Sequence, residues 1–345
     1  MIARTLLLGV SLGLLVGCGA DPEPPAASGG VQARARHADL RQLRDATPEP
    51  FAEAVWYVAG DGVYRSPSAT ASPVRVAGGA PFSAPRGIAF GAAAQTVYVA
   101  DPMAAGGGAL FTVRASDGMV APVAGTVGYA PTALDVQITN GVESLVFTGA
   151  DPMTRQPGVF RVATTAGATP EALHRGAPFA RPDGVYVGAQ TTWVCDARAA
   201  TGERGAVFAL NASGAPTMIA QGFLAGDPCG ISAPLGDAAL MVSVVSEAPS
   251  HSQVLLVNPS TRETSRFDES IRVNIGSGGL HRARYSNQFA WAGLGVDFTP
   301  LFDVIVDAFT PATGRFNGAP CACPSSSRSG CRSAGGSVAF CGACC

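Results

Sequence analysis

Short apolar stretches that alternate with polar residues follow one another along most of the chain, separated by Gly, Ser, Asp and Pro. One unit reads GIAF (87–90), TVYVAD (96–101), GALFTV (108–113) and MVAPVAG (119–125). Alternation over so few residues, bounded by turn formers, predicts four short antiparallel strands per unit. The 43 glycines and 26 prolines among 345 residues favour many tight turns over a mainly helical protein.

The unit recurs with a period of about 47 residues. An apolar-aromatic landmark recurs at spacings of 47, 49, 48 and 47 residues, ending at Tyr64, Phe111, Phe160, Phe208 and Leu255. A second landmark, Pro-x-(Gly or Ala)-apolar, opens the units at Pro85, Pro131, Pro182 and Pro228. Two landmarks that keep one period indicate a repeat architecture, and four short strands per repeat are typical of propeller blades.

These landmarks resemble those of NHL-repeat and gluconolactonase-type propellers over about residues 55–316. The resemblance implies an all-β, six-bladed β-propeller of four-stranded antiparallel blades, which we place at residues 51–317. Five blades with an irregular cap are the alternative. The gluconolactonase resemblance also implies a metal held by Glu, Asn and Asp, but no Glu and Asn stand at matching repeat positions.

Closure of the ring needs an innermost strand for the first unit, which begins directly with a second-strand pattern at Trp56. Ser337–Phe340 (SVAF) is similar to the inner strand Gly87–Phe90 (GIAF), so we predict that the C-terminal segment returns to the first blade. The alternatives are that Pro50–Ala54 supplies this strand or that no segment does.

The N-terminus carries the pattern of an export signal: Arg4, an apolar run, and then Leu15-Val16-Gly17-Cys18. This ending resembles the bacterial lipobox, which implies a lipoprotein signal peptide at residues 1–17 and lipidation of Cys18. An ordinary signal with a chance cysteine is the alternative. Residues 18–50 are predicted to be a disordered tether, and Gly19 favours the outer over the inner membrane as the site of anchoring.

Nine cysteines occur, and their positions suggest three roles. Cys195 ends a second strand and Cys229 begins the next inner strand, so antiparallel geometry predicts a disulfide between neighbouring blades. Six more lie in a predicted disulfide-rich tail, residues 318–345, at Cys321, Cys323, Cys331, Cys341, Cys344 and Cys345. A zinc site built by Cys321, Cys323, Cys341 and Cys344 is the alternative for part of the tail.

Candidate chemistry is confined to a few carboxylates. Asp101, Asp151 and Asp196 each follow a second strand, where a propeller faces its central channel. Together they could hold a hard cation such as Ca²⁺. Alternatively, each caps its own turn through local hydrogen bonds. Asp183, in Arg-Pro-Asp-Gly, is a further candidate on the same face, and His281 is the only histidine placed near the channel.

Composition excludes several function classes. All 23 basic residues are arginine, which removes Schiff-base and P-loop lysine chemistry, and a net charge of −2 gives no footprint for nucleic acid. No nucleophile–base pair at a motif spacing is present. We therefore expect an envelope-anchored propeller that binds a protein or small-molecule ligand. A metal-dependent lactonase or related hydrolase is the alternative.

Overall fold

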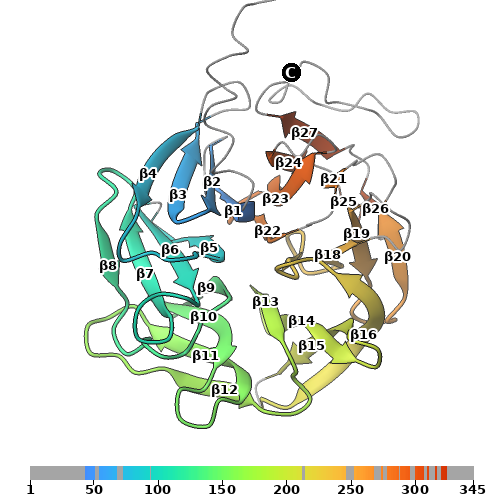
Figure 1. Cartoon of the computed structure of the whole chain (residues 1–345). Helices are drawn as coiled ribbons and strands as arrows, with labels where there is room; N and C mark the ends of the chain where they lie inside the picture. The colour runs from blue at the N-terminus through green and yellow to red at the C-terminus, as the bar shows by residue number, and fades with distance from the viewer. Residues whose placement is uncertain are drawn as a thin grey trace, which may run out of the picture.

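The computed structural model describes residues 43–50, 54–67, 73–93, 95–211, 214–245, 252–267, 273–274, 278–286, 288–295, 300–306, 309–310, 315–316 and 320–324. Within these ranges the chain is all-β and forms strands arranged in a ring (Figure 1). The described residues include no helix long and apolar enough to cross a membrane.

Successive groups of strands form antiparallel sheets around the ring. The first three groups are each a separate four-stranded sheet with the strands in chain order. They contain β1 (Leu43–Pro48), β2 (Val55–Ala59), β3 (Gly62–Ser66) and β4 (Val74–Gly78); β5 (Gly87–Phe90), β6 (Thr96–Asp101), β7 (Ala109–Arg114) and β8 (Val120–Pro122); and β9 (Ala133–Thr139), β10 (Val142–Ala150), β11 (Pro157–Ala163) and β12 (Glu171–Arg175).

The next two groups are joined. They contain β13 (Pro182–Val187), β14 (Thr192–Ala200), β15 (Arg204–Leu210) and β16 (Pro216–Ala225); and β17 (Ile231–Ser232), β18 (Leu240–Val245), β19 (Ser252–Val257) and β20 (Thr264–Phe267). The long strand β16 also pairs with β18 through Leu224 and Ala225, which merges both groups into one eight-stranded sheet.

The last group is less regular. It contains β21 (Val273–Asn274), β22 (Leu280–Arg282), β23 (Gln288–Gly295), β24 (Pro300–Val306) and β27 (Pro320–Pro324), with a separate hairpin of β25 (Phe309–Thr310) and β26 (Arg315–Phe316). Strand β27 pairs with β24, so the sheet extends into the segment that we assigned to the tail. This fold is a β-propeller, as predicted, and its number of blades stays a prediction.

The apolar residues pack between neighbouring groups rather than in one central core. Buried clusters fill each junction, for example Ile88 and Trp56 between the first and second groups and Leu134 and Tyr98 between the second and third. One cluster joins the first group to the last, where Ala46 and Tyr57 pack with Ala290 and Ala292. Burial of these residues packs the first group of strands against the last group, which closes the ring. Neither group is therefore left with an unpacked side.

The closure prediction was wrong in its choice of strand. Strand β1 pairs antiparallel with β2, from Pro48 opposite Val55 to Leu43 opposite Ala59, and so completes the first group from the N-terminal side. Residues 43–48 therefore belong to the propeller, not to the predicted tether. Their sequence, LRDATP, does not show the apolar alternation of a strand. One of its buried positions is instead occupied by Asp45, which is 1% exposed. Residues 337–340 lie outside the described residues.

Candidate functional site

Asp101 and Asp196 perform the same local task in two different groups. Asp101 accepts hydrogen bonds from the backbone N–H groups of Ser83 and Ala84, at 2.7 and 3.1 Å, which precede the inner strand β5. Asp196 accepts from the equivalent N–H groups of Ala180 and Arg181, which precede β13. Both carboxylates are fully buried, so each fixes the chain where it enters an inner strand.

Asp151 caps the loop that follows its own strand. Its Oδ1 accepts from the N–H groups of Met153 and Thr154, at 2.9 and 2.8 Å, and its Oδ2 lies 2.7 Å from Arg175 Nη1. Hydrogen bonds from Thr154 and Arg175 lower the pKa of Asp151 to about 2. Each of the three aspartates accepts a hydrogen bond from the backbone N–H two residues further on, as the local-turn interpretation expects, and Asp101 and Asp196 also bond the more distant segments described above.

A shared metal site at these aspartates gains no support. Across the described ranges, no group of three His, Cys, Asp or Glu side chains could hold a metal ion. The hydrogen bonds explain this, because the oxygens that would face a Ca²⁺ ion at Asp101, Asp151 and Asp196 are already occupied by backbone donors.

Asp183 belongs to a cluster of charges at the face of the ring where the inner strands begin. Arg181 Nη2 lies 3.0 Å from Asp183 and 2.6 Å from Asp227, and Arg86 contacts the same two carboxylates. Arg44 adds a longer pair to Asp227 at 3.4 Å. We call these five side chains, from four groups of strands, the arginine face.

Burial differs sharply within this cluster. The Asp183 side chain is fully buried, whereas Asp227, Arg44 and Arg181 are 49%, 42% and 36% exposed. Burial raises the pKa of Asp183 to about 6 although Arg86 and Arg181 oppose the shift. Burial also works against ionised Asp227, but its arginine partners outweigh it and lower the pKa of that carboxyl.

The arginine face carries one more cation than it has carboxylates. Three guanidinium groups share two carboxyl groups, and the buried Nε of Arg86 has no hydrogen-bond partner within the described part of the chain. Guanidinium groups bind carboxylates through two parallel hydrogen bonds, so the surplus suits a carboxylate on a partner.

Two exposed methionines lie on the same face of the ring, in loops that both begin with Asp-Pro-Met. The segments Asp101-Pro-Met103 and Asp151-Pro-Met153 follow the second strands β6 and β10, and the aspartate in each accepts from the methionine N–H. Met103 is 68% and Met153 is 91% exposed, and Val127, on the segment packed between these loops, is 54% exposed. The aspartates thus hold a small apolar patch outward.

The predicted Cys195–Cys229 disulfide is confirmed, with Cα atoms 5.8 Å apart and both side chains buried. It lies beneath the arginine face, because Cys229 follows Asp227 and Pro228 and its N–H lies 3.4 Å from Asp183 Oδ1. A side chain at Gly184 would collide with the Cys229 carbonyl at 1.8 Å, so only glycine permits this approach.

Four of the five residues of the arginine face were missed by sequence reasoning: Arg44, Arg86, Arg181 and Asp227. A signal was present, because Arg86, Arg181 and Asp227 each adjoin the proline landmark that opens a unit. Because the chain has no lysine and all 23 of its Lys and Arg positions are arginine, a single arginine in the sequence is a weak indication of a functional site.

The remaining predicted cysteines are not tested. Cys321 and Cys323 lie on β27, and their side chains are not described. Cys18, Cys331, Cys341, Cys344 and Cys345 lie outside the described residues.

Comparison with solved structures identifies the fold class alone. A chain of a nidogen/laminin complex matches with a TM-score of 0.53 and 13% identity, covering 69% of this chain and 84% of that one. The tricorn protease matches with a TM-score of 0.52 and 10% identity over 84% of this chain, which spans 27% of the length of the protease. Both contain β-propellers. No protein-family model matches the sequence, and no curated protein matches it.

Proposed function

We propose that this protein is a β-propeller binding module that is held at the cell envelope by lipid on Cys18 and contacts a partner protein through its arginine face. The observation that carries the proposal is the combination of surplus positive charge and exposed methionine on one face. The Met103 loop is connected to the segment before Arg86 through Asp101, which accepts from the N–H groups of Met103 and Ser83.

The chemistry of this face defines the partner. Methionine side chains adapt to varied apolar surfaces, and arginine is enriched at the centres of protein interfaces. The surplus guanidinium can donate two parallel hydrogen bonds to a carboxylate opposite it. We therefore expect a protein that presents an apolar patch beside Asp or Glu side chains.

Capture from the envelope fraction of the source cells tests this proposal. Wild-type protein should retain a defined partner, and the pair Met103→Ser and Met153→Ser should reduce its recovery at least tenfold, which corresponds to about 1.4 kcal/mol. Arg44→Glu should reduce it as well, and salt should weaken the wild-type interaction. Met119→Ser is the matched control, since Met119 is 52% exposed on the β7–β8 turn.

Recovery that none of these variants changes would refute the arginine face as the contact surface. Attachment is read from the same preparations, because Cys18→Ser should move the protein from the membrane fraction to the soluble fraction. A wild-type protein that is soluble without detergent would refute the lipid anchor.

A further inference from the structure

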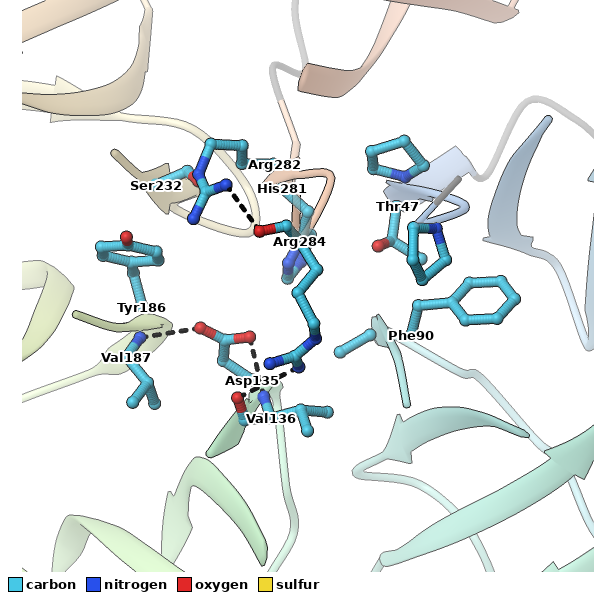
Figure 2. Close-up of a pocket in the computed structure, with 13 residues that line it drawn as sticks. Thr47, Phe90, Asp135, Val136, Tyr186, Val187, Ser232, His281, Arg282 and Arg284 are labelled. Atoms are coloured by element: carbon cyan, nitrogen blue, oxygen red, sulfur yellow. Dashed lines mark hydrogen bonds between the residues drawn. The ribbon is translucent and has the colours of Figure 1, made fainter. Parts of the chain in front are cut away.

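The opposite face of the ring, where the inner strands end, contains a polar cavity of about 120 Å³. Its lining comes from several inner strands and the residues just after them, among them Phe90 on β5, Asp135 on β9, Ser232 on β17 and His281 on β22 (Figure 2). Because a buried water needs about 10–15 Å³ on the same measure, the cavity has room for a small organic molecule.

Two carboxylates already have partners here: Asp135, which lines the cavity, and Asp45, which lies next to it and pairs with the lining residue His281. Asp45 accepts from the N–H groups of Ala46 and Ile88, both at 2.9 Å, and lies 3.0 Å from His281 Nε2. Asp135 accepts from the N–H groups of Val136 and Val187, both at 2.7 Å. Neither carboxylate therefore needs a cation from a ligand.

The positive charge of His281 is favoured by its surroundings. Burial by itself lowers the pKa of His281, but the Asp45 and Asp135 carboxylates outweigh that effect and raise it. Besides His281, the ionisable groups that line the cavity are Asp135, Arg282 and Arg284, and burial raises the pKa of Asp135 although His281 and Arg284 oppose the shift.

The two arginines that line the cavity, Arg282 and Arg284, differ in how many hydrogen bonds they donate. Arg282 donates to the backbone carbonyls of Ala233, Ala283, Arg284 and Ser286, at 2.7 to 3.1 Å, and so fixes the turn that carries Arg284. Arg284 extends across the cavity and makes one long bond, of 3.4 Å, to the Val136 carbonyl (Figure 2).

Two buried donors of the cavity lack partners. The Nε of Arg284 and the hydroxyl of Ser232 form no hydrogen bond to any described residue, and Ser232 is only 1% exposed. A buried donor without an acceptor costs about 1–3 kcal/mol, so two such donors on residues that line one cavity favour an acceptor that the chain itself does not supply.

Apolar rings complete the cavity. Phe90 and Tyr186 are 7% and 8% exposed and lie on opposite sides of Arg284 in Figure 2. The Tyr186 hydroxyl is occupied by Asp237 at 2.7 Å, which leaves its ring as the contact surface. A ligand here meets donors at Arg284 and Ser232 and apolar surface at the rings.

We propose that this cavity binds a small carboxylic acid with a planar apolar body, whose carboxylate accepts from Arg284 and Ser232. Guanidinium and hydroxyl donors match the two oxygens of a carboxylate, and the rings of Phe90 and Tyr186 enclose the body. The site is independent of the arginine face, which lies at the other ends of the same strands.

Three probes of nearly equal size and different charge test the proposal on the purified full chain: benzoate, benzamide and benzylamine. Titration calorimetry should show benzoate binding at least tenfold more tightly than benzamide. Arg284→Gln should weaken benzoate binding at least tenfold, and Ser232→Ala should weaken it a few-fold. Arg114→Gln, at an arginine that is 50% exposed and paired with Asp117, is the matched control.

Benzoate should also raise the unfolding temperature of the wild type and leave that of Arg284→Gln unchanged, a measurement that confirms the variant is folded. Preference for benzylamine, no binding of any probe, or equal benzoate binding by wild type and a folded Arg284→Gln would each overturn the proposal.

Discussion

The two faces of the propeller use charge in opposite ways. On the arginine face, ion pairs are part exposed, with Asp227 at 49% and Arg44 at 42%, and cations exceed carboxylates. At the polar cavity, the His281 side chain and its partner Asp45 are 12% and 2% exposed, and two lining residues, Ser232 and Arg284, have buried donors without partners. The same inner strands thus present a surface suited to a protein at their starts and an enclosure suited to a small molecule at their ends.

The difference follows from which part of the repeat supplies each face. Loops after the second strands recur in sequence, so the Asp-Pro-Met segments at 101–103 and 151–153 place the same chemistry twice on one face. The cavity instead takes different single residues from each inner strand, such as Ser232 and Asp135. A repeated surface suits a broad contact, and a non-repeated enclosure gives selectivity for one ligand.

The largest effect is expected at Asp45, because its carboxylate joins three groups of strands. Asp45→Ala leaves His281 and the Ile88 N–H without their acceptor, and breaking a buried pair costs about 3–5 kcal/mol. Chemical denaturation measures the loss. Asp61→Ala is the matched control, since the Asp61–Arg75 pair is about half exposed and should contribute less than about 1 kcal/mol. Equal losses in both variants would contradict the closure role of Asp45.

Removal of the disulfide should affect binding at the arginine face more than binding at the cavity. The double variant Cys195→Ser and Cys229→Ser removes a link across 34 residues, and its expected cost is about 3–4 kcal/mol in free energy of unfolding. Because Cys229 adjoins Asp183 and Asp227, partner capture should fall more than benzoate binding. Guanidinium unfolding and the two binding assays check this. A larger loss of benzoate binding than of partner capture would contradict the expected difference between the two faces.

The pH dependence of stability should carry a smaller contribution from the arginine face. The pKa of Asp183 is raised to about 6, so the folded protein holds this proton more tightly than the unfolded chain does. The free energy of unfolding therefore falls as pH rises from about 4 to about 6, by at most about 3 kcal/mol from this group. Asp183→Asn should flatten the measured slope over that range. A slope that stays the same would show that Asp183 ionises as readily folded as unfolded.

The repeat made most of the fold predictable. The parts that could not be predicted are those in which polar residues are buried. Landmarks such as Pro182 and Phe208 fix the strands of each unit, and the Cys195–Cys229 pair follows from antiparallel geometry alone. Strand β1 could not be predicted in this way, because Asp45 is buried only through donors from β5 and β22, far away in sequence. The cavity was missed for the same reason, since Arg284 and Val136, 148 residues apart, meet only when the strands are arranged in the ring.

Strand β1 also determines how the proposed anchor would orient the molecule. It is both the first described strand and an inner one, packed between β5 and β22, and it begins on the arginine face. The 24 residues between Cys18 and Leu43 would therefore leave from near the ring axis rather than from the rim. A random-coil chain of that length would span about 25–30 Å, so the proposed anchor would turn the arginine face toward the bilayer. A partner of the arginine face would then bind between the propeller and the membrane surface, whereas a ligand of the cavity would enter from the face turned away from the membrane.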